Sequence, residues 1–370
     1  MKPQLPFYAK TALILLMIWL LLYGIYLGQA ILLPLGFSFL FAVLLRPLDK
    51  KLQAWKLPRV PAILLSLLVA IIVVAGILFL ISTQAASLVG DVPAMKANLL
   101  RLWHNFQAFL DHSFHLNQQR QQQMLDNAKQ KTLNDLGDVL TRMLGTLGAS
   151  IADLLLVPVY VFFFLYYREL LIRFVTFTFD RKHSEKVAEV IHEIRSVVQH
   201  YVTGIMTETA CVAILNYLGL VLLGVPFALL LGIIGAILNL VPYIGGVIAV
   251  ILTALIAYTN TGEVSKLVGV LIIHMIVQFL DNHFFVPYLI GSKVKLNALI
   301  SLLIVFIGGA LCGIGGMFLS IPAIAICKVI FDRVDNLKPW GMLLGDDTEH
   351  WVPIPLPKIK PPKRRRKISA

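Results

Sequence analysis

One long apolar stretch, interrupted near its middle, most constrains how this chain can fold. It covers residues 225–258 and is broken by Asn239, Pro242, Gly245 and Gly246. One membrane crossing needs about 20 apolar residues, and two crossings need roughly 40 and a turn between them. The stretch is too long for one crossing and too short for two. We therefore predict two half-length helices that enter the bilayer, break, and return to the side from which they came.

A second interrupted stretch, residues 296–328, repeats this design. Its middle is rich in glycine and is followed by a proline, the residues being Gly308, Gly309, Gly313, Gly315, Gly316 and Pro322. Non-helical backbone is tolerated at membrane depth only where protein or a water-filled cavity satisfies its polar groups. Paired interrupted segments in two halves of a chain are typical of the binding site of a secondary transporter. We interpret both stretches as broken helical hairpins that gate a transport path.

The composition sets the fold class. Hydrophobic residues make up 58% of the 370 residues and charged residues only 14%, whereas soluble domains carry about a quarter charged residues. The apolar stretches are continuous runs, which excludes the alternating pattern of a membrane β-barrel. We predict an all-α integral membrane protein, a polytopic helical bundle with two Gly/Pro-broken, re-entrant-like hairpins in inverted topology.

The net charge of +12 is concentrated near the end of the sequence. Residues 356–370 are rich in proline, lack acidic side chains and hold seven basic ones, Lys358, Lys360, Lys363, Arg364, Arg365, Arg366 and Lys367. A basic segment beside a membrane is more typical of binding to anionic lipid than to nucleic acid. We expect this tail to contact membrane lipids and expect no nucleic-acid partner.

Apolar spans and basic loops divide the chain into six predicted regions. These are N-terminal membrane helices (1–83), an extracytoplasmic helical domain (84–146), a membrane helix (147–167), a cytoplasmic amphipathic helix (168–201), a transport core (202–330) and a cytoplasmic Pro-rich basic tail (331–370). The loop over residues 46–59 carries five basic residues against one acidic residue, so the positive-inside rule places it and both termini in the cytoplasm. These regions predict a multi-pass membrane protein with both termini in the cytoplasm.

The order of spans makes the two hairpins topological inverses. An outward span over residues 202–223 precedes the first hairpin, which we expect to enter from outside. An inward span over residues 267–287 precedes the second, which we expect to enter from the cytoplasm. Inverted units of this kind build alternating access around a site near the bilayer midplane. Four short full spans are the alternative arrangement.

Ionisable residues inside the spans are candidates for function because such groups are costly in a bilayer. Asp281 ranks first, since Gln278, Asp281 and Asn282 can face one side of a helix before Pro287 ends it. Asp281 either binds a cation or a proton, or caps a broken hairpin by accepting backbone N–H bonds. Glu208 is a relay or substrate contact, or a hydrated group near the interface.

Other polar residues of the spans have weaker claims. Asn239 and Tyr243, at the tip of the first hairpin, are placed to line the path, while Asp153, His274 and His283 are further candidates. The glycines and prolines of both hairpins, with Pro287, are predicted to be gate backbone and not ligands, although the starts of half-helices attract anions.

Neither metal nor cofactor is predicted. His104, His112 and His115 lie in the polar region and are interpreted as scattered surface histidines, with a metal site as the alternative. The three cysteines lie within apolar spans, lack metal-type spacing and imply no disulfide.

Three segments resemble a known family. They are LLGVPFALLLGIIGAILNLVPYIGG at residues 222–246, QFLDNHFFVPYLIG at 278–291 and FIGGALCGIGGMFLSIP at 306–322. Together they look like the signatures of the autoinducer-2 exporter (AI-2E, PerM-like) permease family. The resemblance implies a bacterial inner-membrane permease, homo-oligomeric, from a family that contains exporters of a quorum-sensing furanone and Na⁺/H⁺ antiporters. Gly246 and the pair Asn297–Ala298 depart from the family pattern, which weakens transfer of a substrate by analogy.

Three classes of function follow from these observations. The leading hypothesis is secondary transport, by alternating access, of a small polar solute such as a signalling molecule. Its alternative is a Na⁺(Li⁺)/H⁺ antiporter that uses Asp281 as its ion carboxylate. An enzyme is not expected, because the motifs of serine and zinc hydrolases are missing from the sequence. A membrane scaffold that recruits partners through its polar domain and basic tail is a remote alternative.

Overall fold

The computed structural model describes residues 6–90, 97–98, 101, 151–179, 184–241, 244–291 and 296–346. These residues are almost all helical and contain no strand, which confirms the predicted all-α class. Six of the described helices are long and apolar enough to cross a membrane, so the chain is a multi-pass membrane protein. Most of the predicted extracytoplasmic domain with its histidines, and residues 347–370 of the predicted tail, lie outside the described residues, whereas residues 331–346 of that tail are described and largely helical.

The N-terminal part of the chain forms three long helices and one shorter helix. They are α1 (Phe7–Leu27), α2 (Gln29–Ala54), α3 (Arg59–Gly90) and α6 (Ile151–Tyr166). Helices α2, α3 and α6 pack around a small apolar core of Ala42, Ile63, Leu67, Val161 and Leu165. None of the residues of α1 is buried, so its apolar surface is open to lipid or to another protein.

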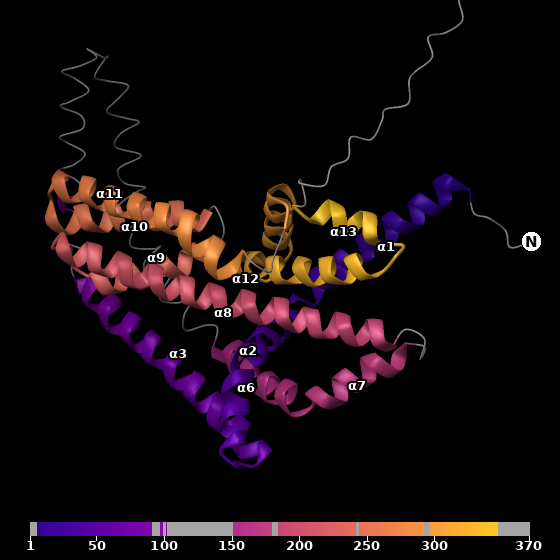
Figure 1. The fold of residues 1–370 in the computed structure, drawn as a ribbon. Coiled ribbons are helices and arrows are strands. Elements are labelled where there is room, and N and C mark those ends of the chain that lie inside the picture. Colours follow the sequence, from indigo (N-terminus) through magenta and orange to yellow (C-terminus); the bar gives the residue numbers. More distant parts are fainter. Residues whose placement is uncertain are drawn as a thin grey trace, which may run out of the picture.

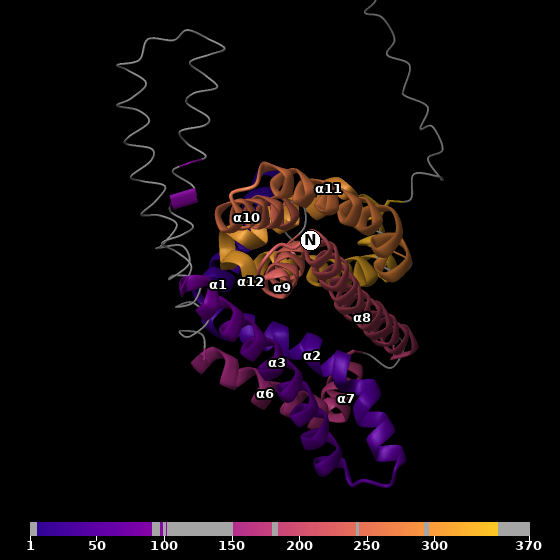
Figure 2. The same ribbon diagram turned by 90° about the vertical axis from the view of Figure 1, so that its left-hand side faces the viewer.

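A single helix joins two regions that the sequence analysis separated. The predicted amphipathic region 168–201 is not one helix: its part from residue 184 onward and the span that follows form one continuous helix, α8 (Ser184–Leu222), of 39 residues. It follows the short helix α7 (Arg168–Thr178). The second view shows α2, α3, α6 and α7 as one layer beside the bundle formed by α8 to α12 (Figure 2). Helix α8 runs along this bundle for its whole length (Figure 1).

The first interrupted stretch folds as two helices with a break between them. Helix α9 (Ala228–Asn239) has 12 residues and α10 (Ile244–Thr261) has 18. At 1.5 Å per residue α9 is about 18 Å long, which is well short of a bilayer core of about 30 Å. Helix α9 packs against both α8 and α10. The short α9 therefore ends, with Asn239, inside the bundle.

The next span changes its helical geometry near its end. Helix α11 (Val264–Leu280) runs directly into a π-helical segment, η2 (Asp281–Ile290). Pro287 was predicted to end the helix, but it lies inside η2. Proline lacks the N–H that an α-helical turn needs, and the wider turn accommodates it. Asp281 is the first residue of the altered segment.

The second interrupted stretch is a helix with a sharp internal break. In α12 (Ala298–Arg333) the backbone leaves helical geometry at Cys312 and Gly313, where Gly313 has φ +60°. The two arms approach so closely that a Cβ on Gly308 would lie 2.5 Å from the carbonyl oxygen of Gly316. Helix α13 (Lys338–Leu344) packs on α12, and the Asn297 N–H donates to the carbonyl oxygen of Leu344 at 2.9 Å. The side from which either broken stretch enters the membrane stays a prediction.

We predict that Gly204→Ala destabilises the protein, because Gly204 is where α8 meets η2. A Cβ at this position would lie 2.3 Å from the backbone carbonyl oxygen of Leu289. Overpacking costs about 1–3 kcal/mol, and we expect this backbone clash to outweigh the gain of roughly 1 kcal/mol that alanine brings to a helix. The unfolding midpoint of the purified protein in detergent measures the effect.

Gly76→Ala is the matched control. Gly76 lies in α3 and has open space where its Cβ would be, so alanine should leave the midpoint unchanged or raise it. Equal midpoints for the two variants would show that α8 and η2 do not pack as closely as described.

Candidate functional site

Three polar side chains from three different helices meet inside the bundle. Glu208 lies on α8, Asn239 is the last residue of α9, and Asp281 is the first residue of η2. The Asn239 Nδ2 group donates to Glu208 Oε1 at 3.0 Å and to Asp281 Oδ2 at 3.0 Å. An amide NH₂ has two hydrogens, so one can serve each carboxyl group. We refer to these residues as the carboxyl cluster.

The breaks in the helices place two members of the carboxyl cluster. Because α9 ends at Asn239, the amide stands at a helix end and reaches two neighbouring elements. Asp281 stands where α11 gives way to π-helical geometry, a deviation that is frequent at functional sites. Glu208 follows Gly204 by one turn of α8, and this glycine lets η2 approach. The interruptions that mark the sequence thus bring polar groups together.

The two carboxyl groups are strongly desolvated. Glu208 is 4% exposed and Asp281 is 3% exposed. A buried charge must be paired or neutralised, because its desolvation is expensive. Within the described residues, neither carboxyl group has an arginine, lysine or histidine ion-pair partner. Apart from the hydrogen bonds that Asn239 donates, their compensation is left to a bound proton or cation.

A small cavity adjoins the carboxyl cluster. It has a volume of about 10 Å³, which is close to the space that one water molecule needs. Its polar lining consists of Asn216, Asn239, His274, Gln278 and Asp281. A cavity of this size holds a water or a small cation and is too small for an organic molecule.

Three buried atoms around the cavity have no hydrogen-bond partner. They are Asn216 Oδ1, His274 Nε2 and Asp281 Oδ1. Nδ1 of His274 lies 3.2 Å from the carbonyl oxygen of Val270, which can only accept, so Nδ1 carries a proton and Nε2 is an acceptor whenever the ring is neutral. Three unpartnered acceptors around one small cavity are suited to a cation or to a water that donates hydrogen bonds.

The structure brings most of the predicted site residues together. Glu208, Asn239 and Asp281 form the carboxyl cluster, and Gln278 lines the cavity next to Gly246. Asn282 is different: its side chain is exposed and accepts only a long hydrogen bond of 3.4 Å from Gln278. Tyr243 lies outside the described residues.

The capping hypothesis for Asp281 finds no support within the described residues. Oδ2 of Asp281 accepts from the side chain of Asn239, and Oδ1 accepts nothing. Of the weaker candidates, His283 is exposed and stacks on Phe279, with ring centroids 4.3 Å apart. The side chain of Asp153 lies outside the described residues.

The gate residues of the sequence analysis occupy the backbone breaks and their flanks. Gly245 lies in the first turn of α10, so close to the end of α9 that a Cβ at this position would overlap the carbonyl group of Leu238. Gly309 packs on Met317 within the broken helix α12, while Gly315 faces Leu33 and Phe37 of α2. Pro322 is buried in the second arm of α12. Pro242 lies outside the described residues.

Asn216 was missed by the sequence analysis, although a signal was present. It follows Glu208 by eight residues, two helical turns, and therefore lies on the same face of α8. A second helical face, which runs from α11 into η2, carries His274, Gln278 and Asp281 at successive spacings of four and three residues. Two polar stripes on apolar helices indicate a shared buried site more strongly than any single residue does.

Comparison with known proteins gives a consistent result. The family described as "AI-2E family transporter" matches residues 14–336. "AI-2 transport protein TqsA" of Escherichia coli is 26% identical over 350 residues, which cover 91% of this chain and 96% of that protein. Two similar proteins carry the name "Putative transport protein": YhhT of Escherichia coli and YrrI of Bacillus subtilis.

The coverage of these two relatives differs. YhhT is 25% identical over 332 residues, which cover 88% of this chain and 91% of that protein. YrrI is 26% identical over 174 residues, which cover 47% of this chain and 49% of that protein, so the aligned part spans about half of its length. The likeness to YhhT and TqsA therefore extends over both the N-terminal helices and the bundle that holds the carboxyl cluster.

We predict that Asn239→Ala destabilises the protein, because it removes the donor shared by two buried carboxyl groups. Leaving a buried acceptor unpaired costs about 1–3 kcal/mol, and here two acceptors lose their partner. The unfolding midpoint should fall. Asn282→Ala removes the same amide from an exposed position on η2 and should stay within about 0.5 kcal/mol of the parent. A normal midpoint for Asn239→Ala would contradict the bridging role.

Proposed function

The chain belongs to the AI-2E family of transporters, and we propose that it is an ion-coupled secondary transporter of a small polar solute. The observation that carries this proposal is the carboxyl cluster, in which two buried acidic groups share one amide and have no basic partner among the described residues. Such a site binds protons or cations in order to exist in an apolar bundle. A site that must bind and release cations is suited to coupling.

The solute in this proposal is a small polar molecule, such as a signalling compound, that is exported from the cell. The name of TqsA assigns transport of AI-2 to that relative, which makes a compound of this chemical class a reasonable first substrate. The cavity beside Asp281 is too small for such a molecule. We therefore assign this cavity to the coupling ion, and we expect the solute to bind where the broken helices separate.

Alternating access is the proposed mechanism. Helix α9 is too short to cross the bilayer, and α12 breaks at Cys312 and Gly313. Broken helices let a gate move without unfolding a complete span. Occupation of the carboxyl cluster by a proton or cation would remove the repulsion between Glu208 and Asp281 and so allow their helices to move together.

A Na⁺(Li⁺)/H⁺ antiporter is the second candidate. It is favoured by one observation, the convergence of three unpartnered acceptors on a cavity of about 10 Å³ beside Asp281. In this version the cation and the proton compete for the same carboxyl groups, and no organic solute is carried. The two candidates share one ion site and differ in what else passes through the protein.

We further propose that the protein lies in the bacterial inner membrane with both termini in the cytoplasm. The basic segment 46–59, which forms the end of α2, its connection to α3 and the first residue of α3, supports this orientation through the positive-inside rule. The basic tail would then face anionic lipid. The exposed apolar surface of α1 suits a homo-oligomer. A scaffold role remains the remote alternative. Deletion of residues 353–370 tests it, because a scaffold should then lose its cellular phenotype whereas a transporter should keep its flux.

We predict that Asp281→Asn abolishes ion coupling. In proteoliposomes that contain a pH-sensitive dye, external Na⁺ or Li⁺ should move protons through the parent protein. An asparagine amide cannot ionise, so proton movement through the variant should fall to the protein-free background. Glu263→Gln removes a carboxylate from an exposed position between α10 and α11 and should keep full activity.

Each result decides between the candidates. Cation-driven proton movement that depends on Asp281 supports the antiporter. A parent protein without any cation-driven signal excludes the antiporter, and the solute transporter is then tested by comparing exported metabolites of cells with parent protein, Asp281→Asn and no protein. Full activity of Asp281→Asn in both assays would overturn the proposed role of the carboxyl cluster.

A further inference from the structure

An apolar groove lies among α2, α3 and α6, and none of its lining residues belongs to the elements that carry the carboxyl cluster. It encloses about 290 Å³ and every residue that lines it is apolar. The lining consists of Phe41, Leu45, Leu67, Ala70, Ile71, Val74, Ala75, Leu78, Val157, Pro158 and Val161. Leu67 and Val161 form its buried floor, whereas Ile71 and Val74 are 46% and 38% exposed at its rim. The groove is thus open on the outer surface of the helical bundle.

The length of the groove matches the depth of one lipid leaflet. Along α3 it extends from Leu67 to Leu78, which is roughly 16 Å at the rise of an α-helix. Half of a hydrocarbon core of about 30 Å is about 15 Å. A groove of this length, open to the side and purely apolar, has the dimensions of an acyl chain that lies parallel to the helices.

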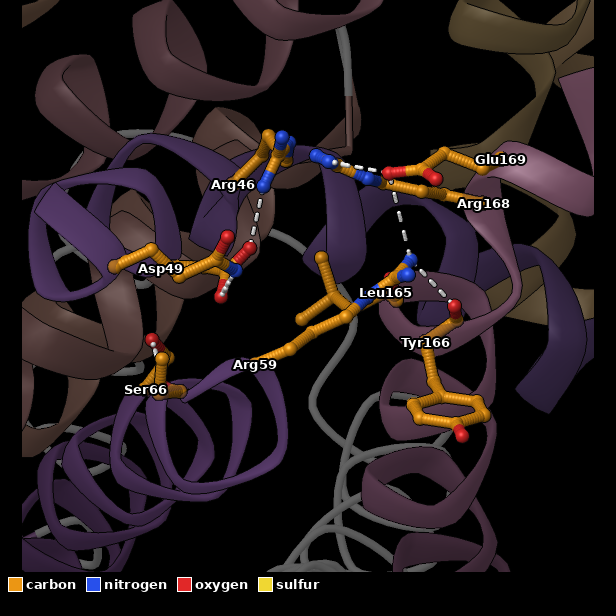
Figure 3. A network of polar contacts seen from close by, with 10 residues as sticks. Arg46, Asp49, Arg59, Ser66, Leu165, Tyr166, Arg168 and Glu169 are labelled. Atoms are coloured by element: carbon orange, nitrogen blue, oxygen red, sulfur yellow. Dashed lines mark hydrogen bonds and ion pairs between the residues drawn. The ribbon is translucent and has the colours of Figure 1, made fainter. Parts of the chain in front are cut away.

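Two arginines, Arg59 and Arg168, lie close together at the ends of α3 and α6 and share one carboxylate (Figure 3). Arg59 Nη2 donates to the carbonyl oxygen of Tyr166 at 2.6 Å and lies 3.9 Å from Glu169 Oε1. Arg168 Nη2 donates to the same Glu169 oxygen at 3.0 Å. Two guanidinium groups therefore share one carboxylate, and their side chains remain 36% and 27% exposed.

The register of each helix connects the groove with this basic end. On α2, Leu45 of the groove directly precedes Arg46, and on α6, Val161 lies one turn before Leu165, whose carbonyl oxygen accepts a hydrogen bond from Arg59. On α3 the groove begins eight residues after Arg59, a distance of about 12 Å. The arginines thus lie beyond one end of the groove, where the phosphate of a lipid whose acyl chain fills the groove would stand.

The charge around the arginines is strongly positive. Residues 46–59 and 168–178 carry seven basic and two acidic side chains. One acidic group, Asp49, is occupied by Arg46 and Gln53. The other is Glu169, whose pKa is lowered by its hydrogen bond to Arg168 and by the charge of Arg59. An anion that arrives here meets an excess of guanidinium donors, with Glu169 as its competitor.

We propose that α2, α3 and α6 form a binding site for one anionic phospholipid, with an acyl chain in the groove and the phosphate at Arg59 and Arg168. Arginine binds phosphate through several charge-assisted hydrogen bonds, and the donors that Arg59 and Arg168 do not use on the protein point to this role. The lipid would join α3 to the start of α7 at the proposed cytoplasmic end. This site is independent of the carboxyl cluster and of what the protein transports.

The test measures lipid binding by the full-length protein. The purified, delipidated protein is titrated with phosphatidylglycerol or with phosphatidylcholine, and bound lipid is counted by native mass spectrometry. The parent protein should bind one phosphatidylglycerol at least about tenfold more tightly than phosphatidylcholine. Both lipids offer a phosphate to the arginines, but the choline cation of phosphatidylcholine is repelled by the excess of basic side chains.

Two pairs of variants locate the site. Ile71→Trp fills the groove and should weaken phosphatidylglycerol binding, whereas Ile72→Trp adds the same bulk at an exposed neighbour outside the groove and should not. Arg59→Gln should remove the preference for the anionic lipid, whereas Lys50→Gln removes a charge from an exposed site on α2 and should keep it. Glu169→Gln, which removes the competing carboxylate, should tighten binding.

Several outcomes would overturn the proposal. Equal binding of both lipids excludes a site that selects an anionic phospholipid, and equal effects of Ile71→Trp and Ile72→Trp exclude the groove as the binding site. Dissociation of an oligomer by Ile71→Trp alone would show that the groove is a contact between copies of the chain. Unfolding midpoints in phosphatidylcholine identify any variant that is misfolded. If Arg59→Gln is misfolded, Arg59→Lys tests the role of the charge instead. Because it keeps the charge, it should bind phosphatidylglycerol more tightly than Arg59→Gln.

Discussion

The bridge from one asparagine amide to two buried carboxyl groups is the interaction on which the rest of this structure depends. Glu208 and Asp281 are almost fully removed from solvent, and Asn239 is the donor that they share. Buried acidic groups are tolerated only where donors, protons or cations compensate them. The requirement fixes how α8, α9 and η2 meet, because all three elements must present their polar residue at one point. The close contact at Gly204 serves the same geometry.

Breaks in otherwise apolar helices place polar groups where neighbouring helices can contact them, which regular helices seldom do. A continuous α-helix satisfies its own backbone and offers few polar groups to a neighbour. Here α9 ends at Asn239, α11 turns π-helical at Asp281, and α12 opens at Cys312 and Gly313. Two of these three irregularities deliver a residue of the carboxyl cluster. The third lies in α12, whose two arms contact each other through glycines, and it divides that helix into two separate arms.

Much of this arrangement could be predicted from the sequence. The rest could not be predicted, and the reasons are physical. The interrupted apolar stretches predicted the breaks, and the cost of ionisable groups in apolar helices singled out Asp281 and Glu208. Asn239 followed from its place at the tip. The cavity that joins Asn216 to His274 depends on how two helices pack, which periodicity within each helix does not determine. The continuity of α8 was missed because its charged first half and apolar second half have different compositions. The contact between Arg59 and the end of α6 links residues 107 positions apart.

The uninterrupted course of α8 has a mechanical consequence. At its first turns Glu189 and Glu193 form ion pairs with Arg333 at the end of α12, at 2.8 and 2.5 Å, and further along the same helix carries Glu208. From Ser184 to Gly204 the helix measures about 30 Å. If Gly204 acts as a fulcrum, a tilt of about 5° displaces Glu189, about 22 Å away, by roughly 2 Å, enough to break its ion pair with Arg333. Helix α8 can therefore transmit a movement at the buried carboxyl groups to the end of α12.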